Sequence, residues 1–200
     1  MLKKYNKHKT RIAFLGPQGS YSHIAAKKYG IYHFGDIIEC SCKKFIDIVQ
    51  AIRNENAEYG ILPIENSTSG PINEVYDILK NNTYISLIGE ITLPIQHCML
   101  VNDNKITFKA IKTIYSHPQP LLQCSHFITH FPQWHIVYCK STSVAMQTVA
   151  TLKKPTIAAV GSKFGSILYG LQILKFNLAN YKHNITRFVV IGYKNKITKF

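Results

Sequence analysis

Short apolar runs alternate with amphipathic stretches along almost the whole chain, and this alternation restricts the fold more than any other feature. The apolar runs have the length of strands, whereas the stretches between them carry apolar residues at helical spacing. Such alternation is typical of an α/β fold. The 200 residues are 46% hydrophobic, which is enough to bury a substantial core. The length fits one domain, or two small lobes that share a cleft.

The same pattern places the individual elements. Strands are expected at residues 11–15, 36–40, 59–64, 113–115, 135–139, 156–160, 171–176 and 188–193, and residues 84–101 form a long β-rich stretch that divides near Pro94. Helices are expected at residues 20–29, 43–53, 71–80, 118–129, 143–152 and 163–169. Pro71 is expected at the first position of its helix, where the missing amide hydrogen costs nothing.

A cluster of small polar residues follows nearly every expected strand, at the start of the next helix. The clusters lie at residues 16–22, 65–70, 116–119, 141–143 and 161–162. In open α/β sheets such junctions meet outside the carboxyl ends of the strands, where ligands bind. Helix N-termini there offer unpaired N–H groups and a partial positive charge to an anion. The clusters together favour a shared anion site, although helix capping explains Ser69 and Ser141 better individually.

Charge is distributed unevenly along the chain. Residues 1–103 hold eleven Lys and Arg against ten Asp and Glu, whereas residues 104–200 hold thirteen against none. Arg187 lies in this second half, and we expect it to hold an anion rather than to close a salt bridge. The excess of basic residues has two alternative explanations. It reflects coding bias that places solvated lysines on the surface, or it creates a positive field that attracts a small anion. No basic stripe with interleaved aromatic residues is present, so no nucleic-acid partner is expected.

The cysteines and the apolar stretches bear on location. Five cysteines, an odd number, are present, and no apolar signal segment follows the first charges. These features predict free thiols in a reducing cytoplasm. Cys40 and Cys42 could share a strand face, but no second pair completes a zinc site, so no metal is expected. Polar residues interrupt the apolar stretches well short of a membrane span, so no membrane insertion is expected.

Several short motifs occur here in the order and at the spacing of one known family. They are residues 13–22 (AFLGPQGSYS), 62–67 (LPIENS), 115–120 (YSHPQP), 123–124 (QC), 169–171 (YGL) and 184–188 (NITRF). On these motifs the chain resembles the prephenate dehydratases from about residue 11 to residue 193. The resemblance implies removal of water and carbon dioxide from prephenate to give phenylpyruvate, on the route to phenylalanine. Aromatisation of the ring drives this reaction, so no cofactor is expected.

The resemblance also implies a fold of two α/β lobes around a substrate cleft, similar to type II periplasmic binding proteins. Residues 11–90 and 177–200 would form the first lobe and residues 91–176 the second, after a basic leader at residues 1–10. An assembly of two or more copies is implied as well. Only twelve residues follow Phe188, so we expect no regulatory domain of the ACT type and insensitivity to phenylalanine. Because residues 1–10 form only a short leader, we expect no fused chorismate mutase either.

The reaction requires a proton donor at the departing hydroxyl, a clamp for the side-chain carboxylate, and a poorly solvated place for the ring carboxylate. The family motif assigns Thr186 to catalysis, and we expect its hydroxyl to donate a hydrogen bond in the transition state. The alternative is a purely structural role in the strand. Glu65 is the rival general acid if burial keeps it protonated, and a structural bond to backbone N–H groups is its alternative.

The remaining site residues are expected to bind substrate. Arg187 would bind a carboxylate or else tie down Glu65 or a carbonyl, because neighbours on a strand face opposite sides. The other expected ligands of the substrate are Ser22, Asn66, Ser67, Ser116, Gln123 and Thr142. Ser116 could also cap the next helix, and Gln123 could face the other lobe. His117 is interpreted as a turn residue and His23 as a packing or surface residue.

Two other classes of function compete with the dehydratase hypothesis. A non-catalytic module with the same cleft would hold an aromatic acid without turning it over. A basic nucleic-acid protein would bind DNA or RNA in a salt-sensitive manner.

Overall fold

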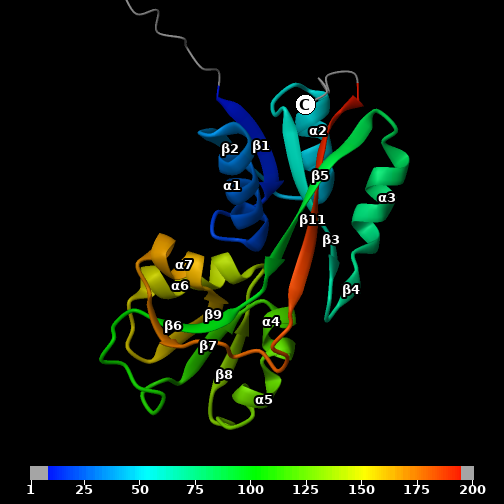
Figure 1. Cartoon of the computed structure of the whole chain (residues 1–200). Helices are drawn as coiled ribbons and strands as arrows, with labels where there is room; N and C mark the ends of the chain where they lie inside the picture. The colour runs from blue at the N-terminus through cyan, green and yellow to red at the C-terminus, as the bar shows by residue number, and fades with distance from the viewer. Residues whose placement is uncertain (1–8, 195–200) are drawn as a thin grey trace, which may run out of the picture.

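The computed structural model describes residues 9–194, whose strands form two separate sheets. Figure 1 shows these sheets as two α/β lobes, one above the other, between which the chain crosses twice. The predicted fold class is therefore confirmed. Of the expected basic leader, residues 1–8 lie outside the described residues, and Thr10 already begins the first strand.

The sheet of the first lobe combines strands from both halves of the chain. It contains β1 (Thr10–Leu15), β2 (Ile37–Cys42), β3 (Tyr59–Asn66), β4 (Gly70–Pro71), β5 (Ile85–Pro94) and β11 (Ile185–Tyr193), and its helices are α1 (Tyr21–Phe34), α2 (Phe45–Arg53) and α3 (Asn73–Asn81). The strand order is β2-β1-β3-β11-β5, with β4 paired to β3. β1 is parallel to β2 and β3, whereas β11 is antiparallel to β3 and β5.

Alternate residues of these strands face opposite layers of helices. In β11, Phe188 and Val190 pack on the side of α1, whereas Val189 and Ile191 pack on the side of α2 and α3. Both faces of the sheet are thus covered, so the central strands have continuously apolar sequences. This explains why the sequence shows them as unbroken apolar runs.

The second lobe has a smaller sheet of the same kind. It contains β6 (His97–Val101), β7 (Thr113–Ser116), β8 (His135–Tyr138), β9 (Ile157–Ser162) and β10 (Gln172–Lys175), and its helices are α4 (Pro118–Gln123), α5 (Ser125–Ile128), α6 (Thr142–Leu152) and α7 (Lys163–Tyr169). The strand order is β10-β6-β9-β7-β8. Met99 of β6 packs in the cluster beside α4, whereas Cys98 and Leu100 pack against α6.

Some expected boundaries are wrong. Pro71 lies in β4, where it pairs with Glu65, and α3 begins only at Asn73. The single helix expected at residues 118–129 is divided at Cys124 into α4 and α5. β11 begins at Ile185 rather than at residue 188, because the polar residues before Phe188 continue the pairing with β3 and β5. β5 reaches Pro94 within the first sheet, so the expected lobe limit at residue 90 falls inside a strand.

The caps of the helices test the expected roles of the polar clusters. Ser141 caps α6, with its Oγ accepting the N–H of Val144 at 3.1 Å. The cap expected at Ser69 is wrong, because the N-cap of α3 is Ile72. Ser69 Oγ instead donates to Asn66 Oδ1 at 3.0 Å. Side-chain oxygens in these clusters therefore serve both helix caps and a hydrogen-bonded turn.

Truncation of Ile61 tests whether the first sheet is buried on both faces. Ile61 in β3 is 0% exposed, whereas Leu87 in β5 is 60% exposed. Ile61→Ala is expected to lower the free energy of unfolding by about 2–5 kcal/mol, because it leaves a cavity. Leu87→Ala is expected to change it by about 0.5 kcal/mol or less. Urea unfolding measures both values, and equal losses would contradict the placement of β3 at the centre of the sheet.

Candidate active site

A cleft of about 300 Å³ lies between the two lobes and is lined by side chains from both. The first lobe contributes Leu15, Tyr21, Ser22, Pro63, Asn66, Ser69, Ile72, Thr186 and Phe188, and the second contributes His97, His117, Gln119, Pro120, Gln123, Lys140, Ser141 and Thr142, with Ile95 between them. Of the expected site residues, Ser22, Asn66, Gln123, Thr142 and Thr186 line this cleft. The structure thus brings together five residues that are far apart in the sequence.

Thr186 and Asn66 are paired across β11 and β3 on the cleft side of the sheet. Asn66 Oδ1 accepts the backbone N–H groups of Thr68 and Ser69 at 3.0 and 3.1 Å, which fixes the orientation of the amide. Asn66 Nδ2 therefore faces β11 and donates to Thr186 Oγ1 at 2.8 Å. Because a hydroxyl both accepts and donates, Thr186 can accept from Asn66 and still direct its own hydrogen toward the cleft.

Asn184 extends this network between the lobes. Its Oδ1 accepts from Asn66 Nδ2 at 2.7 Å, and its Nδ2 donates to Gln123 Oε1 at 3.0 Å. The backbone oxygen of Asn184 accepts the N–H of Ile95 at 2.8 Å, which joins the two segments that cross between the lobes. Asn184 is 2% exposed. Its amide thus links the Thr186 side of the cleft to the second lobe.

Gln123 lies at the cleft and also reaches the other lobe, as the alternative considered for it predicted. Its side chain lines the cleft, and its Nε2 donates to Thr68 Oγ1 of the first lobe at 2.7 Å. Gln123 Oε1 is therefore an acceptor, and it lies 2.8 Å from His97 Nε2. His97 must carry its hydrogen on Nε2 to make this bond. Burial lowers the pKa of His97, and the bond to Gln123 opposes that shift.

Glu65 and Arg187 lie on the opposite face of the same two strands. They pair across β3 and β11, where Arg187 Nη2 contacts Glu65 Oε2 at 3.0 Å and Nη1 lies 3.6 Å from Glu90 Oε2. The expectation that Arg187 forms no salt bridge is wrong. The stretch after residue 104 lacks carboxylates, but β3 and β5 bring two of them beside β11. Neither Glu65 nor Arg187 lines the cleft, because neighbours on a strand face opposite sides.

Ser67 and Ser116 also lie outside the cleft lining. Ser67 Oγ donates to His183 O at 3.0 Å and accepts the N–H of Ile185 at 2.9 Å. These two bonds fix the backbone at the start of β11. Ser116 is 0% exposed, and its Oγ donates to Val160 O at 2.9 Å. The alternative cap role of Ser116 is wrong, because His117 caps α4.

Two histidines take the structural positions that were considered for them. His117 Nδ1 accepts the N–H of Gln119 at 3.2 Å in the turn before α4, while the ring also lines the cleft, and burial lowers its pKa. His23 is 2% exposed and stacks on Phe14 at 4.9 Å between ring centroids. Its Nε2 lies 2.9 Å from Glu39 Oε2. His23 is therefore a packed residue beside the cleft.

The electrostatic character of the cleft follows from its lining. Lys140 supplies a cation, and no Asp or Glu stands among the lining residues within the described part of the chain. The N-terminal turns of α1 and α6 open onto the same space through Ser22 and Thr142. Such a lining favours an anionic ligand. Its apolar remainder, which includes Phe188, Ile95 and Pro63, suits a hydrocarbon ring.

Sequence reasoning missed Lys140, His97 and Asn184. Lys140 directly precedes the polar cluster at residues 141–143, which is a local signal that could have identified it. His97 carried no such signal, whereas Asn184 begins the motif at residues 184–188 but was assigned no role, because the roles of both depend on the meeting of β6 with the segment before β11. That meeting is visible in the bond between the N–H of Leu178 and His97 O at 2.9 Å.

Residues 9–194 also bear on metal binding, membrane insertion and disulfide formation. No group of three or more His, Cys, Asp or Glu side chains there could hold a metal ion. No helix in this range combines the length and apolar character that a membrane crossing requires. Cys40, Cys42, Cys98, Cys124 and Cys139 are all free thiols.

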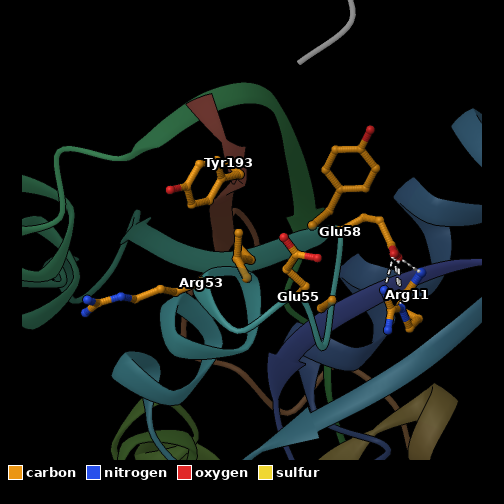
Figure 2. A pocket seen from close by; sticks show the side chains of 8 residues that line it. Arg11, Arg53, Glu55, Glu58 and Tyr193 are labelled. Atoms are coloured by element: carbon orange, nitrogen blue, oxygen red, sulfur yellow. Dashed lines mark hydrogen bonds and ion pairs between the residues drawn. The ribbon is translucent and has the colours of Figure 1, made fainter. Parts of the chain in front are cut away.

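A second hollow, of about 480 Å³, lies at another part of the first lobe and contains none of the expected site residues. Figure 2 shows Arg11 and Glu58 pointing toward each other there, with Arg53 on the other side. Glu58 Oε1 accepts from Arg11 Nε at 3.1 Å, and the guanidinium of Arg53 lies 5.7 Å from the ring of Tyr84. Arg11 and Arg53 thus interact with groups of the same lobe, so the cleft between the lobes is the better candidate for a ligand site.

The fold and the cleft define a two-lobed α/β protein with a small-molecule site between its lobes. A sequence model of the family described as Prephenate dehydratase matches residues 12–196, so the chain belongs to the prephenate dehydratase family.

Named relatives agree with this assignment. The bifunctional chorismate mutase/prephenate dehydratase of Enterobacter agglomerans is 53% identical over 177 residues, which are 88% of this chain and 45% of that protein. The protein of the same name from Escherichia coli strain K12 is 51% identical over 183 residues, covering 92% of this chain and 47% of its own. This chain thus spans about half the length of these curated relatives.

A solved structure supports the fold independently. It is the prephenate dehydratase of Arthrobacter aurescens, described as a complex with L-Phe, which matches with a TM-score of 0.84 and 22% identity. The match covers 96% of this chain and 63% of that one. This likeness shows that the two-lobed fold is shared.

The buried His97 is expected to make stability depend on pH. Because its pKa in the folded state lies below the ordinary value of about 6.5, the folded state disfavours the charged imidazole. Stability is therefore full above about pH 6.5 and is lost as the pH falls below it. His97→Gln should show a smaller loss of urea midpoint than the wild type between about pH 7.5 and about pH 5. The exposed His135→Gln is the control, and identical pH profiles for wild type and His97→Gln would contradict this expectation.

Proposed function

We propose that this chain is a prephenate dehydratase, which converts prephenate to phenylpyruvate with loss of water and carbon dioxide. Membership of the family and the names of its relatives support the proposal. The single observation that carries it is the placement of Thr186. Its hydroxyl is held by Asn66 at 2.8 Å in a cleft whose described lining has no carboxylate.

The chemistry of the reaction defines what the cleft must do. The bond between the ring and its carboxylate breaks, and carbon dioxide leaves. Those electrons enter the ring, which becomes aromatic as the bond to the opposite hydroxyl breaks. The departing oxygen takes up one proton, supplied in net terms by the solvent, and leaves as water. Negative charge therefore moves from the ring carboxylate to the departing oxygen, and a hydrogen-bond donor at that oxygen lowers the barrier.

Thr186 is the donor in this proposal. Its oxygen accepts from Asn66 Nδ2, so its hydrogen is available to the departing hydroxyl. The bond from Asn66 also polarises the Thr186 hydroxyl, which strengthens it as a donor. Thr186 is 8% exposed, so water competes poorly for its hydrogen. A donor that is oriented before the reaction needs no reorganisation during it.

Asn66, Gln123, Ser22 and Thr142 are proposed to bind substrate, because their side chains line the cleft with Thr186. Ser67 and Ser116, which were expected to bind it too, are proposed instead to hold the backbone of β11 and β7 in place.

Glu65 and Arg187 are proposed to act from behind the sheet. Their ion pair fixes the strands that carry Asn66 and Thr186 on the opposite face. Glu65 is half exposed and paired with Arg187, which makes it unsuitable as a buried general acid. Their contribution is to position the strand, not to contact the substrate.

Several broader features are also proposed. We place the first lobe at residues 10–94 with 185–193, and the second at 97–175, following the strands rather than the limits expected from the sequence. The resemblance to the family further supports a cytoplasmic location and an assembly of at least two copies.

Loss of the Thr186 hydroxyl tests the proposed function most simply. The purified chain is expected to form phenylpyruvate from prephenate at neutral pH, and Thr186→Ala is expected to lower kcat by about 10²- to 10⁴-fold. The free energy of unfolding should fall by only about 1 kcal/mol, since Asn66 Nδ2 keeps Asn184 Oδ1 and Ile185 O as acceptors. Thr186→Ser, which keeps the hydroxyl, should retain most of the turnover.

Two outcomes would contradict these expectations. Absence of phenylpyruvate with the wild-type chain, together with tight binding of prephenate, would identify a non-catalytic module instead. Unchanged turnover in Thr186→Ala would remove Thr186 from the mechanism.

A double-mutant cycle tests the positioning role of Arg187. Arg187→Met removes the contacts with both Glu65 and Glu90, whereas Glu65→Gln removes the shorter one, so Arg187→Met should lower kcat/KM by the same factor as Glu65→Gln or by slightly more. The double variant should be little worse than either single one, because the two residues act as a unit. Arg187 would instead contact the substrate directly if Arg187→Met alone caused a large loss and Glu65→Gln caused none.

A further inference from the structure

Two helix N-termini from opposite lobes meet at one end of the cleft. α1 begins after its cap Ser20, and α6 begins after its cap Ser141. A β-carbon built on Gly19, directly before the cap of α1, would lie 3.4 Å from Ser143 Oγ, so the entry to α1 contacts the first turn of α6. Gly19 has a φ of +85°, a conformation that glycine adopts without strain. A side chain at this position would be strained by the backbone conformation and would also crowd Tyr169 of α7, 3.0 Å from the built β-carbon.

Each of these first turns carries a nearly buried hydroxyl that faces the cleft. Ser22 of α1 is 7% exposed and Thr142 of α6 is 9% exposed, and both line the cavity. Within residues 9–194, neither side chain has a hydrogen-bond partner in the structure. Both side chains are more than nine-tenths buried and open only onto the cavity, so their unpaired hydroxyls are available to a ligand's acceptor atoms.

The charge at this end of the cleft indicates what kind of ligand group it accepts. Lys140 precedes α6 and lines the same space. The partial positive charges of the two helix N-termini add to that of the lysine. No lining carboxylate within the described part of the chain competes with a bound anion. A carboxylate has acceptor oxygens for both hydroxyls and a charge that matches the helix termini.

We propose that Ser22, Thr142 and Lys140 form the subsite for the side-chain α-keto carboxylate of prephenate, and not for its ring carboxylate. The proposal rests on the proposed dehydratase function and assigns the ends of the substrate within that site. The side-chain carboxylate keeps its charge from substrate to product. Donors that hold it therefore bind substrate and transition state equally, which lowers KM without opposing the reaction.

The same donors would be harmful at the ring carboxylate. That group must lose its charge as carbon dioxide, and donors that stabilise the charge would raise the barrier. The apolar lining, with Phe188, Ile95 and Pro63, offers the ring carboxylate an environment without such donors. Thr186 then faces the departing hydroxyl, which lies across the ring from both carboxylates. The cleft thereby separates a polar binding end from a catalytic end.

Phenylpyruvate is the probe that separates the two carboxylates, because it retains the side-chain carboxylate and has lost the ring carboxylate. Calorimetry with phenylpyruvate should show about 10- to 100-fold weaker binding to Thr142→Val and to Ser22→Ala than to the wild type. The KM for prephenate should rise by a similar factor, while kcat changes by less than about threefold. Lys140→Met should weaken the dependence of KM on ionic strength.

Matched variants in α6 and directly after its C-terminal end provide the controls. Thr142→Ser keeps the hydroxyl and should restore binding, whereas Thr151→Val and Lys154→Met alter exposed residues with the same chemistry and should bind phenylpyruvate like the wild type. Phenylpyruvate binding that is unchanged in Thr142→Val and Ser22→Ala would overturn the proposal, as would a fall in kcat at unchanged KM. The binding readout needs no turnover, so a failure of the dehydratase assignment would appear separately, as absence of product from prephenate.

Discussion

The side-chain amide of Asn66 holds the candidate site together. Its oxygen accepts the backbone N–H groups of Thr68 and Ser69, and its nitrogen donates to Thr186 Oγ1 and Asn184 Oδ1. One buried amide thus fixes a turn, a strand and the segment that connects the lobes. An amide has separate donor and acceptor ends. An aspartate at this position would offer two acceptors to Thr186 and Asn184, and the network would lose its direction.

The alternation of faces along a strand separates the charged chemistry from the cleft. Asn66 and Thr186 face the cavity, whereas Glu65 and Arg187 pair on the opposite face of the sheet. The result is a cavity that contains hydroxyls, amides and a lysine but no carboxylate among its described lining residues. Such a cavity favours an anionic ligand, because Lys140 has no carboxylate among the described lining residues to pair with. The ion pair behind the sheet supports the same strands without weakening this field.

Local patterns in the sequence predicted much of the fold, because strand and helix periods are local properties. The apolar runs became the central strands of both sheets, and the five cleft residues were found at junctions and in a family motif. Pairing between distant strands was not predictable in this way. Arg187 lies in a half without carboxylates, yet β3 and β5 place Glu65 and Glu90 beside it. His97 and Asn184 acquire their roles only where the lobes meet.

A crystal structure of Thr186→Val with prephenate bound would show directly which end of the substrate faces position 186, since this variant keeps the shape of the side chain and removes its hydroxyl. We expect the departing hydroxyl of prephenate to lie against the methyl groups of the substituted side chain, beside Asn66 Nδ2. We also expect the α-keto carboxylate between Ser22 and Thr142. The proposed mechanism would be wrong if the hydroxyl of the substrate pointed away from position 186, or if its ring carboxylate lay between the first turns of α1 and α6.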